Sequence, residues 1–125
     1  MSCLFISIGK LIGQPHTIVR KNICDYMVSH LDMNHQGMRL KEWIQWQTPN
    51  GNVLEYIQNM RAHHVWGGAM EIAVATQLYQ CDIIVFNSRK QPLAEFLWKD
   101  RCICRTRLYI EWNGSHYEPI SKHNL

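Results

Sequence analysis

Residues 66–79 read Trp66-Gly67-Gly68-Ala69-Met70-Glu71-Ile72-Ala73-Val74-Ala75-Thr76-Gln77-Leu78-Tyr79, a glycine loop that runs directly into a helix. The residue types and their period predict a strong helix over residues 69–79. Residues 81–87 follow as a short β-branched run bounded by a turn, which is typical of a buried strand. A helix that leads into a buried strand indicates a compact α/β (α+β) fold with a small central β-sheet flanked by helices.

Elements of both kinds extend outward from this centre. Upstream, apolar residues at helical spacing predict helices over residues 3–12, from His16-Thr17 to Leu31 with Thr17 as N-cap, over 40–47 and over 53–60. Downstream, residues 93–100 fit either a strand or a loop. Alternation predicts a strand over 102–112, Asn113-Gly114 predicts a hairpin turn, and residues 116–120 form the returning strand.

Length and composition bound the class of protein. The chain has 125 residues, of which 46% are hydrophobic and 18% charged, so we expect a single globular domain over residues 1–125. The net charge of +3 is too small to indicate a nucleic-acid partner by itself. No apolar run approaches the roughly 18–20 residues of a membrane span, so we expect no membrane association. We also expect a monomer.

The number of cysteines indicates the redox state of the compartment in which the protein resides. There are five, an odd number, at positions 3, 24, 81, 102 and 104. The apolar start has neither a basic region nor a small-residue cleavage site, so we predict no signal peptide. Reduced thiols in a cytoplasmic protein then explain the odd count better than a disulfide framework.

Known metal and phosphate motifs are missing from the sequence. Cys102-Ile103-Cys104 is a CxC pair, best explained as small residues on one strand face, and no CxxC or HExxH is present. There is no GxGxxG or Walker-type loop, and no GxSxG for a serine nucleophile. We therefore expect neither a metal nor a cofactor.

A cysteine–histidine pair is the best catalytic candidate. Cys3 lies where a helix begins, and the positive end of a helix favours a thiolate. His116 starts the last strand after a tight hairpin, where an imidazole can be held rigidly, and Glu118 lies on the same face of that strand. The alternative is that Cys3 is a buried small hydrophobic residue and His116 an ordinary turn histidine.

Five segments in order resemble the ovarian-tumour (OTU) family of cysteine proteases, the deubiquitinases related to papain-like enzymes. The family's nucleophile lies in a block of the form D-G-x-C-L-F, and Ser2-Cys3-Leu4-Phe5 is similar to its right-hand part. The helix at 18–27 resembles a second block, and Tyr56–Met60 with Trp66–Ile72 resembles a Y-x-x-x-M helix followed by W-G-G-x-x-E-I. The core strand at 83–87 and the hairpin at 110–120 complete the set.

The resemblance implies an OTU-like, papain-like fold with Cys3 as nucleophile and His116 as general base and then acid. Glu118 occupies the position where the family usually has Asp or Asn to orient the ring. The loop Trp66-Gly67-Gly68 resembles the wall of the narrow channel that receives the Gly-Gly tail of ubiquitin, and Asn113 is a further substrate-binding candidate. The alternative for this loop is a helix-entry turn with Trp66 in the core.

The leading hypothesis is therefore a thiol-dependent deubiquitinase that acts on ubiquitin or a related modifier, in the host cytoplasm if the chain is viral. The family's Asp three residues before the cysteine has no counterpart in these 125 residues. This motivates a second hypothesis, either a fragment or a weak or inactive OTU-like module that binds ubiquitin or another protein. A third hypothesis, a small nucleic-acid binder, rests on a basic set that is more simply a solvated strand face: Arg89, Lys90, Arg101, Arg105 and Arg107.

Overall fold

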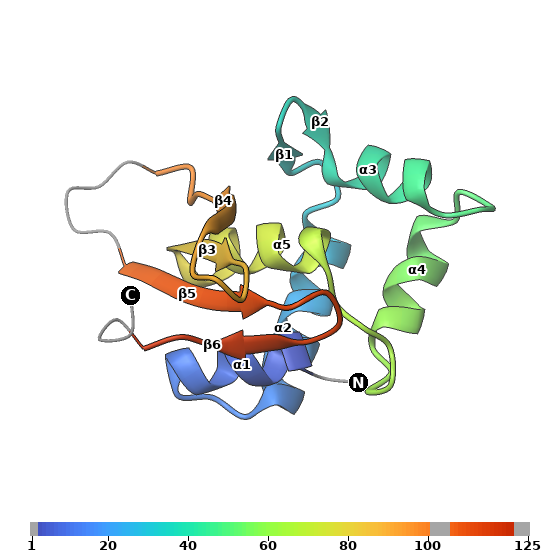
Figure 1. The fold of residues 1–125 in the computed structure, drawn as a ribbon. Helices are drawn as coiled ribbons and strands as arrows, with labels where there is room; N and C mark the ends of the chain where they lie inside the picture. The colour runs from blue at the N-terminus through green and yellow to red at the C-terminus, as the bar shows by residue number, and fades with distance from the viewer. Residues whose placement is uncertain (1–2, 101–105, 122–125) are drawn as a thin grey trace.

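The computed structural model describes residues 3–100 and 106–121, and Figure 1 shows its ribbon. The elements in chain order are α1 (Cys3–Ile12), α2 (His16–Ser29), β1 (Asn34–His35), β2 (Met38–Arg39), α3 (Leu40–Gln47), α4 (Val53–Met60), α5 (Ala69–Tyr79), β3 (Cys81–Phe86), β4 (Pro92–Phe96), β5 (Thr106–Trp112) and β6 (Tyr117–Pro119). In this part of the chain, no helix combines the length and the apolar character that a membrane crossing requires.

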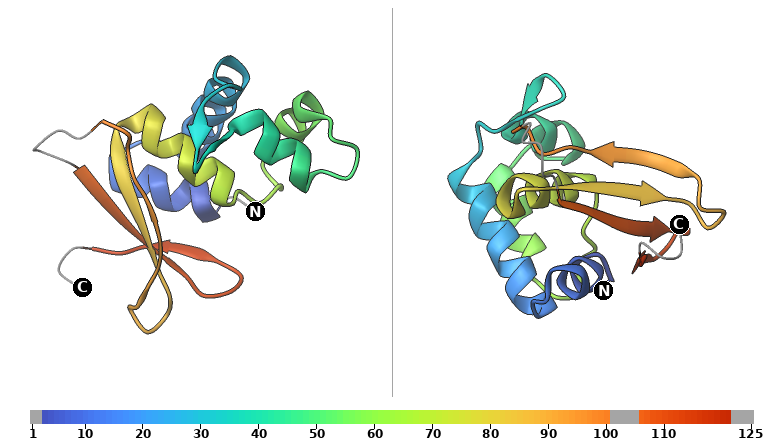
Figure 2. Two further views of the ribbon diagram at one scale, coloured as in Figure 1. Left: turned by 90° about the horizontal axis from the view of Figure 1, so that it is seen from above. Right: turned by 90° about the vertical axis from the view of Figure 1, so that its left-hand side faces the viewer.

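The main sheet forms one layer and the larger helices form the other. Its strand order is β4-β3-β5-β6, with β3 and β5 parallel and the two outer pairs antiparallel. Both views in Figure 2 place the sheet on one side of the molecule, with α5, α2 and α1 behind it, while α3 and α4 extend to one side. This mixed α+β arrangement with a small sheet confirms the predicted fold class.

The core lies between the sheet and the helices, with α5 at its centre. Every residue from Met70 to Thr76 is buried, because this helix has neighbours on all sides. A helix that is apolar all round is buried rather than amphipathic. The fully buried side chains packed around it come from α1, α2 and the strands, among them Phe5, Ile8, Ile23, Met27, Ile83 and Ile110.

The second helix differs from the prediction at both ends. Thr17 is not its N-cap, because the helix already begins at His16 and Pro15 occupies the cap position with φ −62° and ψ 143°. The proline ring fixes φ near the helical value and its carbonyl accepts from the Ile18 and Val19 N–H groups. The helix ends at Ser29, before the predicted Leu31.

The strands refine the sequence-based expectations. Of the ambiguous residues 93–100, the first part is strand, since β4 runs from Pro92 to Phe96. The small hairpin β1–β2 was not predicted, because two-residue strands are too short to show alternation. Its turn has positive φ at Gln36 and Gly37. Residues 101–105, which include Cys102, Cys104 and two of the candidate basic residues, lie outside the described part.

Candidate active site

The first turn of α1 presents the thiol of Cys3. Cys3 is the first residue of the helix and is partly exposed, whereas Cys24 and Cys81 are buried, so the alternative of a buried small hydrophobic residue does not hold. The Ser7 hydroxyl donates to the Cys3 carbonyl at 2.8 Å, and Leu4 and Phe5 anchor the turn in the core. No acidic residue lies in this first turn, so the positive helix end stays uncompensated there.

A rigid turn between β5 and β6 carries His116. The side-chain oxygen of Asn113 accepts from the His116 N–H at 2.8 Å, from the Ser115 N–H at 3.0 Å and from the Ser115 hydroxyl at 3.2 Å. The Asn113 N–H in turn donates to the His116 carbonyl at 3.2 Å. Gly114 takes φ +101°, which suits glycine. Asn113 therefore fixes the backbone that carries the imidazole.

α1 packs against β6, and the start of α1 and the β5–β6 turn both lie toward the right-hand end of the sheet in Figure 1. Tyr117 is the residue after His116. Burial raises the pKa of Tyr117, and electrostatic interaction with Cys3 and Glu71 raises it further, so Tyr117 lies near Cys3. Between the described residues there is no hydrogen bond from the thiol to the His116 ring. Catalytic hydrogen bonds are often long before substrate binds.

The loop Trp66-Gly67-Gly68 lies between the two candidates. A Cβ at Gly67 would be 2.8 Å from Leu4 Cδ2 and 2.9 Å from Phe5 Cζ, so a larger residue would have to displace these two buried side chains of the first turn of α1. Trp66 is 49% exposed, which excludes the alternative of Trp66 in the core. Its ring centroid lies 6.1 Å from that of His116, at an interplanar angle of 35°. The loop thus contacts the cysteine helix on one side and the histidine on the other.

Glu118 is on β6, opposite Glu111 in the antiparallel register. His116 does not start the strand as predicted, because β6 begins at Tyr117, so alternation along β6 does not place Glu118 and His116 on one face. Its side chain is exposed, and within the described residues it makes no hydrogen bond or ion pair, whereas Glu111 pairs with Lys90 at 2.6 Å. The role of Glu118 in orienting the imidazole stays a prediction.

Two buried charged residues hold the loop; both lie within segments that resemble the family, but the sequence analysis gave neither a role. Arg20 on α2 is 4% exposed and Glu71 on α5 is 1% exposed. A carboxylate three residues into a helix is a known capping signal, so Glu71 could have been found from its position after Gly68. No local signal marks Arg20, because its partners lie far away in the sequence.

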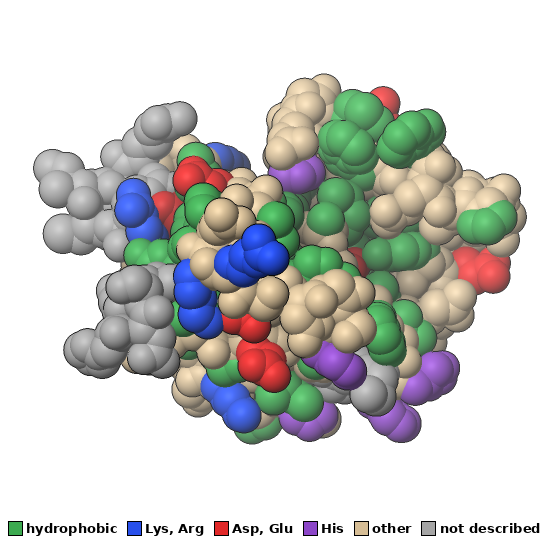
Figure 3. Space-filling model, in the orientation of Figure 1, with side chains coloured by type: hydrophobic (Ala, Val, Ile, Leu, Met, Phe, Trp, Pro, Cys, Tyr) green, Lys and Arg blue, Asp and Glu red, His purple; other side chains and the backbone are tan. Residues whose placement is uncertain are grey.

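Histidine side chains gather along the lower right of the face in Figure 3, near the start of α1. The described residues nevertheless contain no group of three or more His, Cys, Asp or Glu side chains placed to hold a metal ion. Two described members of the basic set lie beside acidic side chains. Lys90 pairs with Glu111, and the Arg107 Nε lies 3.6 Å from the Asp82 carboxylate.

Solved structures with the same fold are OTU domains. The OTU domain protease of Farallon virus superposes with a TM-score of 0.71 at 18% identity, covering 96% of this chain and 78% of that one. The OTUD1 OTU domain gives a TM-score of 0.70 at 17% identity, with 94% and 77% covered. An OTU domain solved in complex with ubiquitin gives 0.69 at 21%, with 94% and 62% covered. The architecture is therefore that of an OTU domain.

Sequence comparison gives the family. The sequence model of the OTU-like cysteine proteases matches residues 2–118, nearly the whole chain, and the chain belongs to this family. It is 29% identical over 68 residues to the ubiquitin thioesterase OTU1 of Gallus gallus and 31% identical over 68 residues to that of Danio rerio. Each match covers 54% of this chain and 22% of the relative, so the chain spans only about a fifth of the length of these relatives.

Proposed function

We propose that this chain is a cysteine-dependent deubiquitinase that cleaves ubiquitin or a related modifier from proteins. The observation that carries the proposal is the placement of Cys3 at the start of α1, at the same end of the molecule as His116 on the β5–β6 turn, with the loop 66–68 between them. Family membership supports it, as do the relatives, which are named ubiquitin thioesterases. Ubiquitin is also the bound partner in one solved structure of the same fold.

Each candidate residue has a distinct role in the proposed reaction. His116 takes the proton of the Cys3 thiol, and the resulting thiolate attacks the carbonyl carbon of the modifier's C-terminal glycine to form a tetrahedral intermediate. When the C–N bond breaks, His116 protonates the departing lysine amine, and a thioester to Cys3 remains. His116 then takes a proton from water, which attacks the thioester and releases the modifier and the thiol. Glu118, two residues after the histidine, stabilises the imidazolium.

Substrate binding falls to the loop Trp66-Gly67-Gly68 and the turn at Asn113. A Cβ at Gly68 would find its nearest atom, a Glu71 carboxylate oxygen, only at 4.0 Å, so the backbone there is open to close approach. Backbone without side chains suits a narrow channel for a Gly-Gly tail. Trp66 supplies an exposed aromatic wall above this approach.

The direct test is covalent labelling with ubiquitin that carries an electrophile at its C-terminus. We expect one adduct, located on Cys3 by mass spectrometry of the digested product, in folded wild-type protein. The Cys3→Ser variant should give none, while Cys81→Ser keeps the reaction because that thiol is buried at the start of β3.

The same experiment separates the proposal from an inactive ubiquitin-binding module. An inactive module binds ubiquitin in a pull-down or by calorimetry, keeps that binding in Cys3→Ala, and gives no adduct and no cleavage of ubiquitin chains. Folded wild-type protein that forms no adduct at saturating probe would sink the catalytic proposal.

A further inference from the structure

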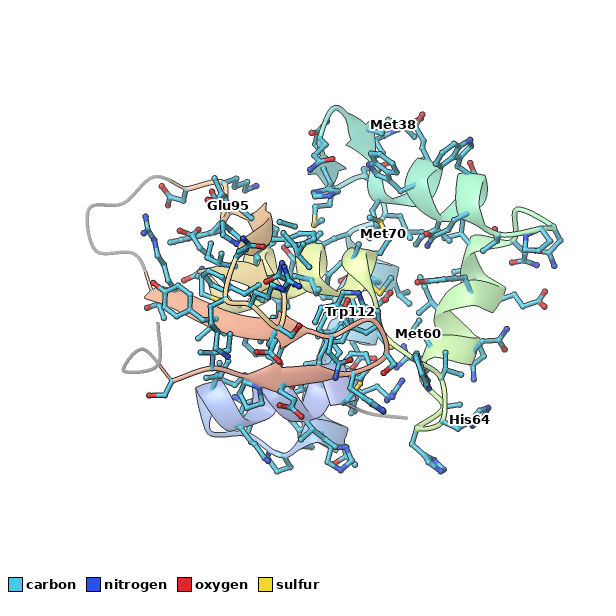
Figure 4. The ribbon with its side chains drawn as sticks, viewed as in Figure 1. Met38, Met60, His64, Met70, Glu95 and Trp112 are labelled. Atoms are coloured by element: carbon cyan, nitrogen blue, oxygen red, sulfur yellow. The ribbon has the colours of Figure 1, made fainter. Side chains whose placement is uncertain are left out.

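The segment between α4 and α5 has neither helix nor strand over residues 61–68, yet it ends in the candidate substrate loop. Figure 4 labels Met60 at the end of α4 and His64 in the segment that follows. Neither the Trp66 nor the Gly67 N–H has a backbone acceptor within the described residues. The conformation of the loop therefore depends on side chains that reach it from other elements.

Arg20 holds the first half of this segment. From α2 its guanidinium donates to the Met60 carbonyl at 2.7 Å, to the Val65 carbonyl at 2.9 Å and to the His63 carbonyl at 3.2 Å. The guanidinium carbon also lies 4.2 Å from the centroid of the Phe5 ring, on the helix that begins with Cys3. One planar, buried cation thus joins the cysteine helix to the backbone immediately before Trp66.

Glu71 holds the second half. One carboxylate oxygen accepts from the Gly68 N–H at 2.7 Å, and the other accepts from the Tyr56 hydroxyl on α4 at 2.8 Å. The Ile72 N–H donates to the Gly68 carbonyl at 3.0 Å, so Gly68 is held on both sides of its peptide. The loop is consequently held by hydrogen bonds at Val65 and at Gly68, and Trp66 and Gly67 lie between these two positions.

We infer that Arg20 and Glu71 are positioning residues that hold the loop 66–68 in the shape that receives the substrate tail. The inference rests on the proposed function, and it assigns the two residues to substrate binding rather than to bond chemistry. Neither side chain is exposed enough to touch substrate. Their loss therefore weakens recognition of ubiquitin while leaving the intrinsic reactivity of Cys3 unchanged.

The experiment compares four variants with wild type. Arg20→Lys keeps the charge but loses the planar fork that spans three carbonyls. Glu71→Ala removes both acceptors, whereas Glu71→Gln keeps an acceptor for Gly68 and a polar contact to Tyr56. Arg61→Lys is the matched control, because Arg61 lies in the same segment but pairs with Asp25 at the surface, at 2.7 Å.

Three measurements are made on each folded variant: saturation kinetics with the ubiquitin electrophile, alkylation of Cys3 by iodoacetamide, and hydrogen exchange of the two loop amides that are hydrogen-bonded, Val65 to the Ala62 carbonyl and Gly68 to Glu71. For Arg20→Lys and Glu71→Ala we expect the half-saturating probe concentration to rise at least about tenfold, because small misplacements of binding groups cost this much or more. Iodoacetamide alkylation stays within about twofold and the loop amides exchange faster. Glu71→Gln and Arg61→Lys behave like wild type.

Equal losses toward ubiquitin and iodoacetamide, or unchanged loop exchange in Arg20→Lys and Glu71→Ala, overturn the inference. If one of these variants does not fold, the other decides, since each anchors a different end of the loop. Should wild type fail to react with the ubiquitin probe, the proposed function fails on its own, and hydrogen exchange still decides whether Arg20 and Glu71 hold the loop.

Discussion

Trp66 and His116 face each other with their ring centroids 6.1 Å apart, although one lies before α5 and the other after β5. The indole belongs to the loop that packs on the cysteine helix, and the imidazole belongs to the turn held by Asn113. The imidazole is exposed, and the indole is its aromatic neighbour. Its orientation therefore depends on the loop as well as on its own turn.

Replacing Trp66 by Ala should lower kcat/KM toward a fluorogenic ubiquitin substrate by up to about tenfold. The aromatic pair contributes about 0.5–1.5 kcal/mol, and about 1.4 kcal/mol corresponds to a factor of ten in rate. Stability should change little, because the indole is 49% exposed. Trp46→Ala serves as control, since Trp46 on α3 is 80% exposed and does not contact His116. Equal effects of the two variants would contradict this prediction.

The two loop glycines should respond differently to a methyl group. Gly67→Ala places a Cβ within 2.8 Å of Leu4 Cδ2, so urea unfolding should show a loss of about 1–3 kcal/mol from overpacking. Gly68→Ala meets nothing closer than 4.0 Å and should stay within about 0.5 kcal/mol of wild type. If the tail passes close to this backbone, Gly68→Ala raises KM for ubiquitin in a fully stable protein. A destabilised Gly68→Ala, or a neutral Gly67→Ala, contradicts the structure.

Asn113→Ala should reduce activity by about 10- to 100-fold, because misplacement of a catalytic group by about 1 Å has such effects. The variant loses the acceptor for the His116 N–H and for Ser115, which should also cost about 1 kcal/mol of stability. Asn113→Asp keeps the accepting oxygen and should retain most of the activity. Steady-state kinetics with chemical denaturation of both variants checks this, and equal loss in Asp and Ala would argue for a direct substrate contact.

Glu118→Gln should lower kcat by less than about tenfold. In a serine-protease triad the corresponding carboxylate to amide change costs about 10⁴-fold, but there the group is buried and hydrogen-bonded to the histidine. Glu118 is exposed and, within the described residues, has no hydrogen bond to His116. A fall of a thousandfold or more in single-turnover cleavage would mean that the carboxylate reaches the imidazole when substrate binds.

The pH dependence of stability should carry a contribution from Glu71. Burial raises the pKa of this carboxyl group, although hydrogen bonds from Gly68 and Tyr56 and the charge of Arg20 oppose the rise. Between the unfolded pKa of about 4.3 and the raised folded pKa, the folded state binds more protons than the unfolded state. The free energy of unfolding therefore falls as pH rises through this range. Above the folded pKa the contribution is level.

Urea unfolding of wild type and Glu71→Gln across this pH range checks the sign. The amide of Glu71→Gln does not titrate. As pH rises, the free energy of unfolding of wild type should therefore fall relative to that of the variant. A parallel pH profile for the two proteins would show that Glu71 has the same pKa in the folded and unfolded states.

Local patterns predicted the helices and the main strands well. The limits of α1 and α5 follow from apolar spacing and from the loops before and after them, and β5 follows from alternation. The pattern also put Cys3 at a helix start and His116 in a hairpin, because both depend on neighbouring residues. The cap of α2 was wrong because Thr17 satisfies a general preference that Pro15 overrides by starting the helix earlier.

The support of the site could not be predicted in this way. Arg20 acts on carbonyls some forty residues away, at 60, 63 and 65, and a carbonyl exists at every position of any sequence. Burial of the guanidinium is decided by where α4 and the following segment pass, which is a property of the whole fold. Similarly, the need for glycine at 67 comes from the packing of Leu4 and Phe5, not from a turn.

The packing of α1 on β6 has a consequence for how the protein matures. These are the first and last elements of the described residues, so their contact joins segments that lie far apart in the sequence. Joining them closes a loop over nearly the entire sequence, and such distant contacts form late and slowly. Under the proposed function, a chain in which α1 and β6 have not yet packed holds the Cys3 thiol apart from the His116 imidazole.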